Sequence, residues 1–144
     1  MAERLRFRSA RELRKILDQV MKEIESDPDD APRVGAAAAP LRLEFTDLGL
    51  VMNVSRSDRG ELRWDFRKRS ALAPKLCLEM ESEFGNRFFQ GGENAAIAIA
   101  RGRIRTQVSD AGAALRFFPA SKPIFSRYRR VVLEKYPHLA LDPD

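Results

Sequence analysis

Cysteine and histidine are nearly absent from this chain of 144 residues, which has one of each, Cys77 and His138. A single cysteine excludes an internal disulfide and fits a reducing, cytoplasmic setting. A zinc site of the usual kinds needs more cysteines and histidines, and any serine or cysteine nucleophile would have to use His138 as its base. The sequence also lacks a Walker loop and a G-x-G-x-x-G motif. We therefore expect no catalytic activity, no metal site and no cofactor.

Long hydrophobic runs are missing as well. No apolar stretch approaches the roughly 20 residues of a membrane span, and the N-terminus lacks the apolar core of a secretory signal. Basic residues outnumber acidic ones by 26 to 21, and the net charge of +5 permits binding to phosphates or anionic lipids. Only six of the 26 are lysines, and arginine favours bidentate phosphate contacts. Compositional bias explains the arginines better than a nucleic-acid surface, because the aromatic residues fall on predicted apolar faces.

The first 40 residues contain one strong helix signal. A capping box spans Ser9 to Glu12, and apolar residues follow it at helical spacing. The Asp-Pro pair at 27–28 ends this pattern, so we predict a helix over 10–26 with one apolar face. The stretch 26–40 contains three prolines, a glycine and four consecutive alanines, which is typical of a linker. We favour packing of the helix on its own domain; the alternative is a subunit that docks a partner protein, or a second copy, through it.

From residue 41 onward the hydrophobic period changes to two. Apolar and polar residues alternate in four segments, which turn or loop signals separate. The residues predicted to face inward are Leu41, Leu43, Phe45, Leu50, Met52, Val54, Leu62, Trp64, Phe66, Leu76, Leu78 and Met80. Four consecutive strands of this kind predict an antiparallel meander with one apolar face and one wet face.

The stretch from Asn94 to Val108 fits two incompatible structures. Alternating isoleucines favour one long strand, whereas an asparagine cap, a run rich in alanine and Gly102 favour a short helix that ends at the glycine. A strand of this length would be unusual, and Gly102 would weaken its centre. We therefore predict a helix over 95–101, followed by a fifth strand over 103–108.

Three further helices are predicted on either side of this stretch. The first starts at Ser82, carries phenylalanines four residues apart and closes at the glycine pair 91–92. The second covers 109–118 and is stopped by a proline. The third runs from 121 to 136, with a proline in its first turn and another just after its end.

The order of these elements resembles the sterol carrier protein type 2 family. The residues that carry the resemblance are Phe84, Phe88 and Gly91 in EFGNRFFQG, Asn94 to Ala100, Gly102-Arg103-Ile104-Arg105, and Ser109-Asp110. The resemblance covers about 41–137, so we divide the chain into an N-terminal helix and linker at 1–40 and a domain at 41–144. It implies an α+β fold in which short helices cover one face of a five-stranded, mostly antiparallel sheet, here with an extra N-terminal helix. It also implies non-catalytic carriage of a lipid, such as a fatty-acyl or sterol-like molecule, in a tunnel between sheet and helices.

The residues themselves give this tunnel a physical basis. Large side chains on the sheet and on two helices, opposite a helix made mainly of alanine, leave room for an apolar ligand. The alternative is that these side chains interdigitate to normal packing density. The predicted tunnel residues are Trp64, Phe66, Leu78, Met80, Phe84, Phe88, Phe89, Ile97, Ile104, Phe117 and Phe118.

Three arginines are predicted at the rim of the tunnel. Arg103 and Arg105 would project together from the fifth strand, and Arg101 would lie close to them at the end of the preceding helix. Such a group suits an anionic head group, or transient contact with an anionic membrane. The alternative is that these arginines only keep a sheet face soluble.

Overall fold

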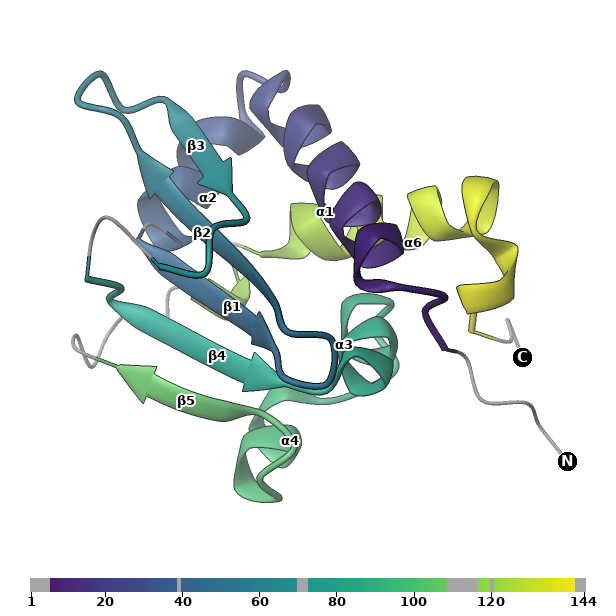
Figure 1. Cartoon of the computed structure of the whole chain (residues 1–144). Helices are drawn as coiled ribbons and strands as arrows, with labels where there is room; N and C mark the ends of the chain where they lie inside the picture. Colours follow the sequence, from purple (N-terminus) through teal and green to yellow (C-terminus); the bar gives the residue numbers. More distant parts are fainter. Residues whose placement is uncertain (1–5, 39, 70–72, 109–116, 120, 142–144) are drawn as a thin grey trace, which may run out of the picture.

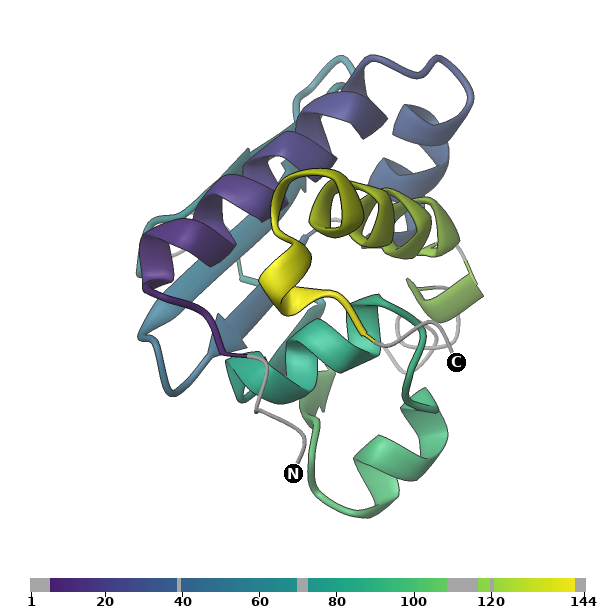
Figure 2. The same cartoon turned by 90° about the vertical axis from the view of Figure 1, so that its right-hand side faces the viewer.

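The computed structural model describes residues 6–38, 40–69, 73–108, 117–119 and 121–141. Its elements form two layers, a single five-stranded sheet and a set of helices on one face of that sheet (Figure 1). In Figure 2 the helices face the viewer and the sheet lies behind them. The predicted α+β class, with a five-stranded sheet that helices cover on one face, is confirmed. The helices are α1 (Ala10–Glu25), α2 (Asp30–Ala38), α3 (Ser82–Phe89), α4 (Ala95–Ala100) and α6 (Lys122–Lys135), with a short 3-10 helix η1 (Pro137–Leu139).

The sheet is mostly antiparallel, but its strand order differs from the predicted meander. β1 and β4 are parallel neighbours, whereas the other three neighbouring pairs are antiparallel. The chain therefore leaves β3 at one edge, crosses to the far side of β1 and adds β4 there. The reason is that alternation tells which face a residue occupies, but not which strand lies beside it. The strands are β1 (Leu41–Phe45), β2 (Leu50–Arg56), β3 (Leu62–Asp65), β4 (Leu76–Met80) and β5 (Arg105–Val108), in the spatial order β3-β2-β1-β4-β5.

Helix α1 packs on its own chain. Ser9 Oγ accepts the backbone N–H of Glu12 at 3.3 Å, as the capping signal predicts. The helix lies against α6, and its apolar face joins the same core as the inward-facing strand residues. That face is therefore covered without a partner. Its buried residues are Leu13, Ile16, Leu17, Val20, Met21 and Ile24.

A second helix, α2, occupies most of the segment predicted as a linker, so that prediction is wrong. Asp27 Oδ1 accepts the backbone N–H groups of Asp29 and Asp30, at 2.9 and 3.0 Å, and this starts the helix. Arg127 of α6 then donates to Asp30 at 2.7 Å and to Asp27 at 3.1 Å, which fixes α2 to α6. Alanine is the best helix former and proline is tolerated in a first turn, so the run that indicated a linker suits a helix as well.

The stretch from Asn94 to Val108 is a short helix followed by a strand, as predicted. Asn94 Oδ1 accepts the N–H of Ile97 at 3.0 Å, and Gly102 has a φ of +73°. The strand begins at 105 rather than 103, because the N–H of Arg103 still donates to a carbonyl of α4 at 2.9 Å. Arg103 therefore belongs to the helix end and not to the strand.

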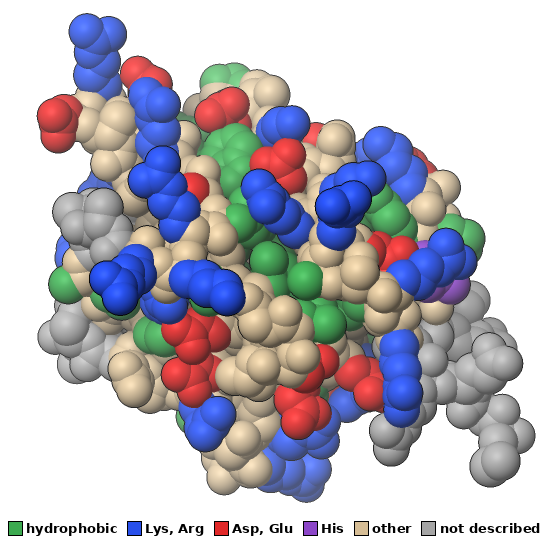
Figure 3. All heavy atoms as spheres, in the orientation of Figure 1, with side chains coloured by type: hydrophobic (Ala, Val, Ile, Leu, Met, Phe, Trp, Pro, Cys, Tyr) green, Lys and Arg blue, Asp and Glu red, His purple; other side chains and the backbone are tan. Residues whose placement is uncertain are grey.

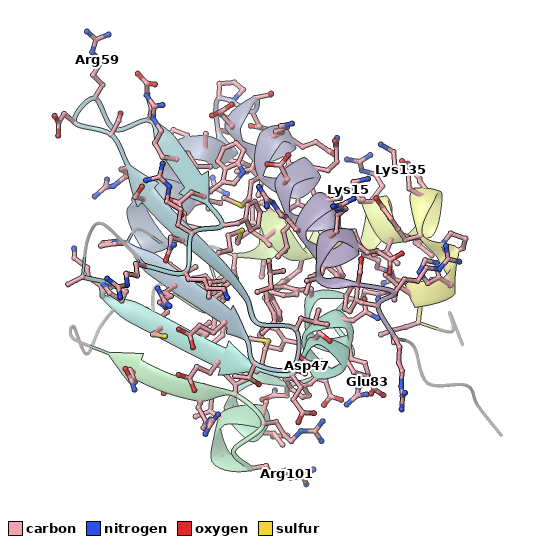
Figure 4. The ribbon with its side chains drawn as sticks, in the orientation of Figure 1. Lys15, Asp47, Arg59, Glu83, Arg101 and Lys135 are labelled. Carbon is pink, nitrogen blue, oxygen red and sulfur yellow. The ribbon has the colours of Figure 1, made fainter. Side chains whose placement is uncertain are left out.

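The start of α3 is held by a side chain from another part of the chain. Ser82 is the first residue of the helix rather than its cap, and the capping residue, Glu81, makes no side-chain capping bond. Asp47, in the turn between β1 and β2, instead accepts the N–H of Ser82 at 2.7 Å and its hydroxyl at 2.6 Å (Figure 4). This contact joins α3 to the sheet.

The C-terminal helix α6 follows its prediction, from Ser121 as N-cap to an end at Tyr136. Residues 117–119 are helical, and the rest of the helix predicted over 109–118 lies outside the described residues. Among the described residues, none of the helices combines the length and the apolar character that a membrane crossing requires.

Candidate functional site

Five phenylalanines gather between the sheet and the helices α3 and α6, and we call them the phenylalanine cluster. Its members are Phe84, Phe88, Phe89, Phe118 and Phe125. Phe88 lies at the centre, with ring centroids 5.2 Å from Phe125, 5.7 Å from Phe89, and 6.2 Å from both Phe84 and Phe118. Three of these four contacts are edge-to-face, an arrangement that aromatic rings favour. Phe118 and Phe125 are only partly buried, so the cluster reaches the surface on that side.

A buried polar network supports the phenylalanine cluster. The Tyr128 hydroxyl donates to Asn86 Oδ1 at 2.9 Å, and burial raises the pKa of Tyr128, which therefore stays protonated. Asn86 Nδ2 and Gln90 Nε2 both donate to the carbonyl of Leu139, at 2.8 and 2.9 Å. The network thus ties α3 to α6 and η1. Sequence reasoning missed it, although two buried amides four residues apart on a phenylalanine-bearing helix carry a signal.

Most of the predicted tunnel residues are brought together in the structure. Eight of the predicted tunnel residues belong to the core. Phe118 is partly buried at its edge, and the other seven are buried. The residues that the fold unites in this way are Leu78, Met80, Phe84, Phe88, Phe89, Ile104, Phe117 and Phe118.

Three predicted tunnel residues lie elsewhere. Ile97 is 51% exposed on α4, because the face of this helix that points to the core is that of Ala98. Trp64 and Phe66 touch the core only at its periphery and line a surface groove beside α1. Phe66 also lies beyond the end of β3, which stops at Asp65. These three predictions are corrected accordingly.

Among the described residues, side chains pack closely in the region of the phenylalanine cluster. Four grooves formed by described residues lie at the surface, and none of these four is lined by a member of the phenylalanine cluster. The rings touch one another instead, as in a close-packed core. A ligand between sheet and helices would therefore have to part these rings.

The three predicted rim arginines do not form one group on a strand face. The Arg103 guanidinium lies over the ring of Phe84, 4.9 Å from its centroid. Arg105 instead pairs with Glu79 of β4 at 3.3 Å. Arg101 stands exposed at the end of α4, pointing away from the body of the molecule (Figure 4). The prediction that Arg103 and Arg105 project together is wrong, because Arg103 precedes the strand.

The parallel pairing of β1 and β4 brings together a thiol and two carboxylates that the sequence separates. Ligand atoms of Glu44, Cys77 and Glu79 lie within 4.8 Å of one another. Both carboxylates already have cationic partners, since Arg42 pairs with Glu44 and Arg105 pairs with Glu79 at 3.3 Å. Burial, with the two nearby carboxylates, raises the pKa of Cys77 and keeps it a thiol. This neutralised cluster gives no support to a metal site or a nucleophile.

No protein-family model and no curated protein matches the sequence. Solved structures match it in fold. Sterol carrier protein 2 aligns with a TM-score of 0.57 at 14% identity, over 80% of this chain and 94% of that chain. The UbiJ-SCP2 ubiquinone synthesis protein aligns with a TM-score of 0.56 at 13% identity, over 77% and 88%.

A third match is part of a much larger protein. The stereoselective inverting sec-alkylsulfatase Pisa1 from Pseudomonas sp. aligns with a TM-score of 0.51 at 16% identity, over 64% of this chain and 14% of that chain. The chain thus spans only a small part of that enzyme's length. Because all three identities are low, the matches establish architecture alone. They show that the chain has the sterol carrier protein 2 fold.

Proposed function

We propose that this protein binds and carries a lipid or another apolar small molecule, without catalysis, between its sheet and its helices. The phenylalanine cluster is the observation that carries the proposal. It is a layer of aromatic rings that begins in the core at Phe89 and reaches the surface at Phe118 and Phe125. The presence of the same fold in sterol carrier protein 2 also supports this proposal.

A ligand enters, in this proposal, when the rings of Phe118 and Phe125 separate from the ring of Phe88. Parting two aromatic pairs costs about 1–3 kcal/mol beyond the apolar area involved. Burying a methylene group returns about 0.8 kcal/mol, so about four methylenes offset that cost. An acyl chain or a fused ring system is long enough to do so, whereas a small polar molecule is not.

The test is binding of a fluorescent fatty acid to the delipidated full chain, followed by displacement with unlabelled oleate. We expect saturable binding of one probe per chain. Phe88→Leu keeps the site apolar but removes the ring contacts, so it should tighten binding by roughly tenfold, or about 1.4 kcal/mol. Phe66→Leu is the matched control, because Phe66 belongs to the groove beside α1 and not to the cluster.

Two results would contradict the proposal. Probe binding that oleate does not displace would show that the chain has no specific apolar site. Displaceable binding to which Phe88→Leu and Phe66→Leu respond equally would place the ligand outside the phenylalanine cluster.

We further propose that α4 brings the protein to an anionic membrane for lipid exchange. This helix contains no charged residue, carries the half-exposed Ile97, and is followed by the exposed Arg101. It projects from one end of the molecule, apart from α1 and α6, in both views (Figures 1 and 2). An apolar tip beside a cation suits insertion at an anionic lipid surface.

The chain offers a matched control for this second proposal. Ile97→Ser with Arg101→Ala removes about 1.5 kcal/mol of apolar burial and about 1 kcal/mol of charge attraction, so sedimentation with anionic vesicles should weaken by more than about tenfold. Leu133→Ser with Arg129→Ala makes the same chemical change on α6, where Leu133 is equally exposed, and should leave binding unaltered. Equal loss in both double variants, or none in the first, would rule out α4 as the contact.

A further inference from the structure

The largest of the described surface grooves lies between helix α1 and the edge strand β3. It encloses about 840 Å³ and contains two aromatic side chains among charged ones. Figure 3 shows hydrophobic side chains at the surface between β3 and α1, with Lys and Arg side chains on either side. We call it the α1–β3 groove. Its lining residues are Arg11, Arg14, Lys15, Asp18, Trp64, Asp65, Phe66 and Arg67.

Both carboxylates of the α1–β3 groove are engaged within the protein. Asp18 accepts the indole N–H of Trp64 at 2.9 Å and pairs with Lys22 at 3.0 Å. Asp65 accepts a side-chain N–H of Asn53 and the backbone N–H of Arg67, both at 3.0 Å. The two acids therefore hold residues of the groove in place, and Asp18 fixes the indole of Trp64.

The cationic side chains of the groove, in contrast, are not paired with carboxylates in the described part of the chain. Arg11, Arg14, Lys15 and Arg67 are exposed, and among the described residues none of them has a carboxylate within ion-pair distance. Arg14 lies over the ring of Phe66, 5.0 Å from its centroid, which pre-orients its guanidinium. The groove thus keeps a surplus of positive charge directly beside partly exposed aromatic rings.

We propose that the α1–β3 groove binds a small anionic ligand with a flat aromatic ring, of which a nucleotide is the prototype. An indole and a phenyl ring offer surfaces for stacking, and arginine forks match phosphate oxygens in a bidentate way. The site is separate from the phenylalanine cluster, since the two share no residue, and the proposal does not depend on lipid binding.

Trp64 allows a direct test, because it is the only tryptophan of the chain. The emission of the full-length protein, excited selectively at tryptophan, is followed during titration with ATP, adenosine and tripolyphosphate, and calorimetry provides a second measure of affinity. We expect a saturable change with ATP. Adenosine lacks the charge and tripolyphosphate lacks the ring, so each should bind at least about tenfold more weakly. Tripolyphosphate binding as tightly as ATP would overturn the proposal, as would the absence of saturation at millimolar ATP.

A pair of matched double variants separates the groove from general surface charge. Arg11→Ala with Arg14→Ala should weaken ATP binding by at least about tenfold. Arg59→Ala with Arg101→Ala removes the same charge at two remote places, the tip of the β2–β3 turn and the end of α4 (Figure 4), and should leave affinity unaltered. Equal losses in the two variants would refute a localised site. An oligonucleotide that binds more tightly in proportion to its length would refute a small-molecule site and favour single-stranded nucleic acid.

Discussion

Two groups of aromatic side chains in this molecule have opposite surroundings. The phenylalanine cluster, which we call the dry group, lies mostly in the core and reaches the surface only at Phe118 and Phe125, and its rings touch other rings. Trp64 and Phe66, which we call the wet group, are partly exposed at the edge of the core, and they contact Asp18 and Arg14 of α1. All of these aromatic residues come from segments in which apolar residues recur at the spacing expected of a core. The comparison teaches that the neighbours of an aromatic residue, rather than its place in a pattern, decide whether it serves packing or recognition.

The strand order explains the difference. β3 lies at an edge of the sheet, so one side of Trp64 has no further strand to cover it. Phe66 follows the last residue of this edge strand and is free to turn toward α1. β4, in contrast, lies between β1 and β5, and the helix that follows it places its phenylalanines over the covered face. An edge position thus supplies the exposure that a binding groove needs.

The largest expected effect is loss of stability in the dry group. Phe88→Ala removes the central ring and leaves a cavity, so the free energy of unfolding should fall by about 3–5 kcal/mol. Phe66→Ala removes the same side chain from the wet group and should cost less than about 1.5 kcal/mol, because the site is open to water. Urea unfolding of both variants measures the contrast. Similar losses would mean that Phe66 is part of the core after all.

The buried polar network gives the next largest effect. Asn86→Ala leaves the Tyr128 hydroxyl without its acceptor and removes one donor to the carbonyl of Leu139, so we expect a loss of about 2–3 kcal/mol. Tyr128→Phe removes only one hydrogen bond, since Asn86 Oδ1 keeps its bond from Gln90 at 2.9 Å, and should cost about 1 kcal/mol. Thermal unfolding should rank the two variants in this order. The reverse order would show that the tyrosine, and not the amide, organises the junction.

Much of the fold was predictable because its signals are local. The capping pair at the start of α1, Asn94 before α4 and the left-handed Gly102 each act on their own few residues. The neighbours of β4 were not predictable, since its parallel pairing with β1 joins two strands that are distant in the sequence. Helix α2 was missed for a similar reason, as the contact of Arg127 with Asp30 joins distant parts of the sequence.

The candidate sites also divide into features set by local sequence signals and features set by contacts between distant segments. Phe84 and Phe88 were predicted together because residues four apart share a helix face. Phe125 was missed as a member of the cluster, because its contact with Phe88 joins two helices distant in sequence. The groove beside α1 was also missed, since alternation alone assigns Trp64 to the core. Side chains that gather from several elements become a site only once the elements are placed.

The smallest expected effect is a pH dependence of folding stability that arises from the Asp18 carboxyl. It is also the effect most specific to the wet group. Partial burial acts to raise the pKa of this carboxyl, but the hydrogen bonds from Trp64 and Lys22 and the charges of Lys22 and Arg14 outweigh it, so the pKa lies below its ordinary value. A lowered pKa in the folded protein means that the ionised group stabilises the fold above about pH 4, and that this contribution is lost as the pH falls through the folded pKa. Tyr128, the ionisable group beside the dry cluster, stays protonated throughout this range.

The measurement is urea unfolding between pH 5 and pH 2.5, together with the emission of Trp64, for the natural chain and for Asp18→Asn. The natural chain should lose more stability across this range than the variant, because only the natural chain must protonate the carboxyl that accepts the indole N–H. Its emission should change with a midpoint below about pH 4, and this step should be absent in Asp18→Asn. Other acidic groups with lowered pKa values, such as Asp27, titrate in both proteins and cancel in the difference. If the two pH profiles run parallel, the indole is not held by the ionised carboxylate, and the wet group lacks the fixed ring that a stacking site requires.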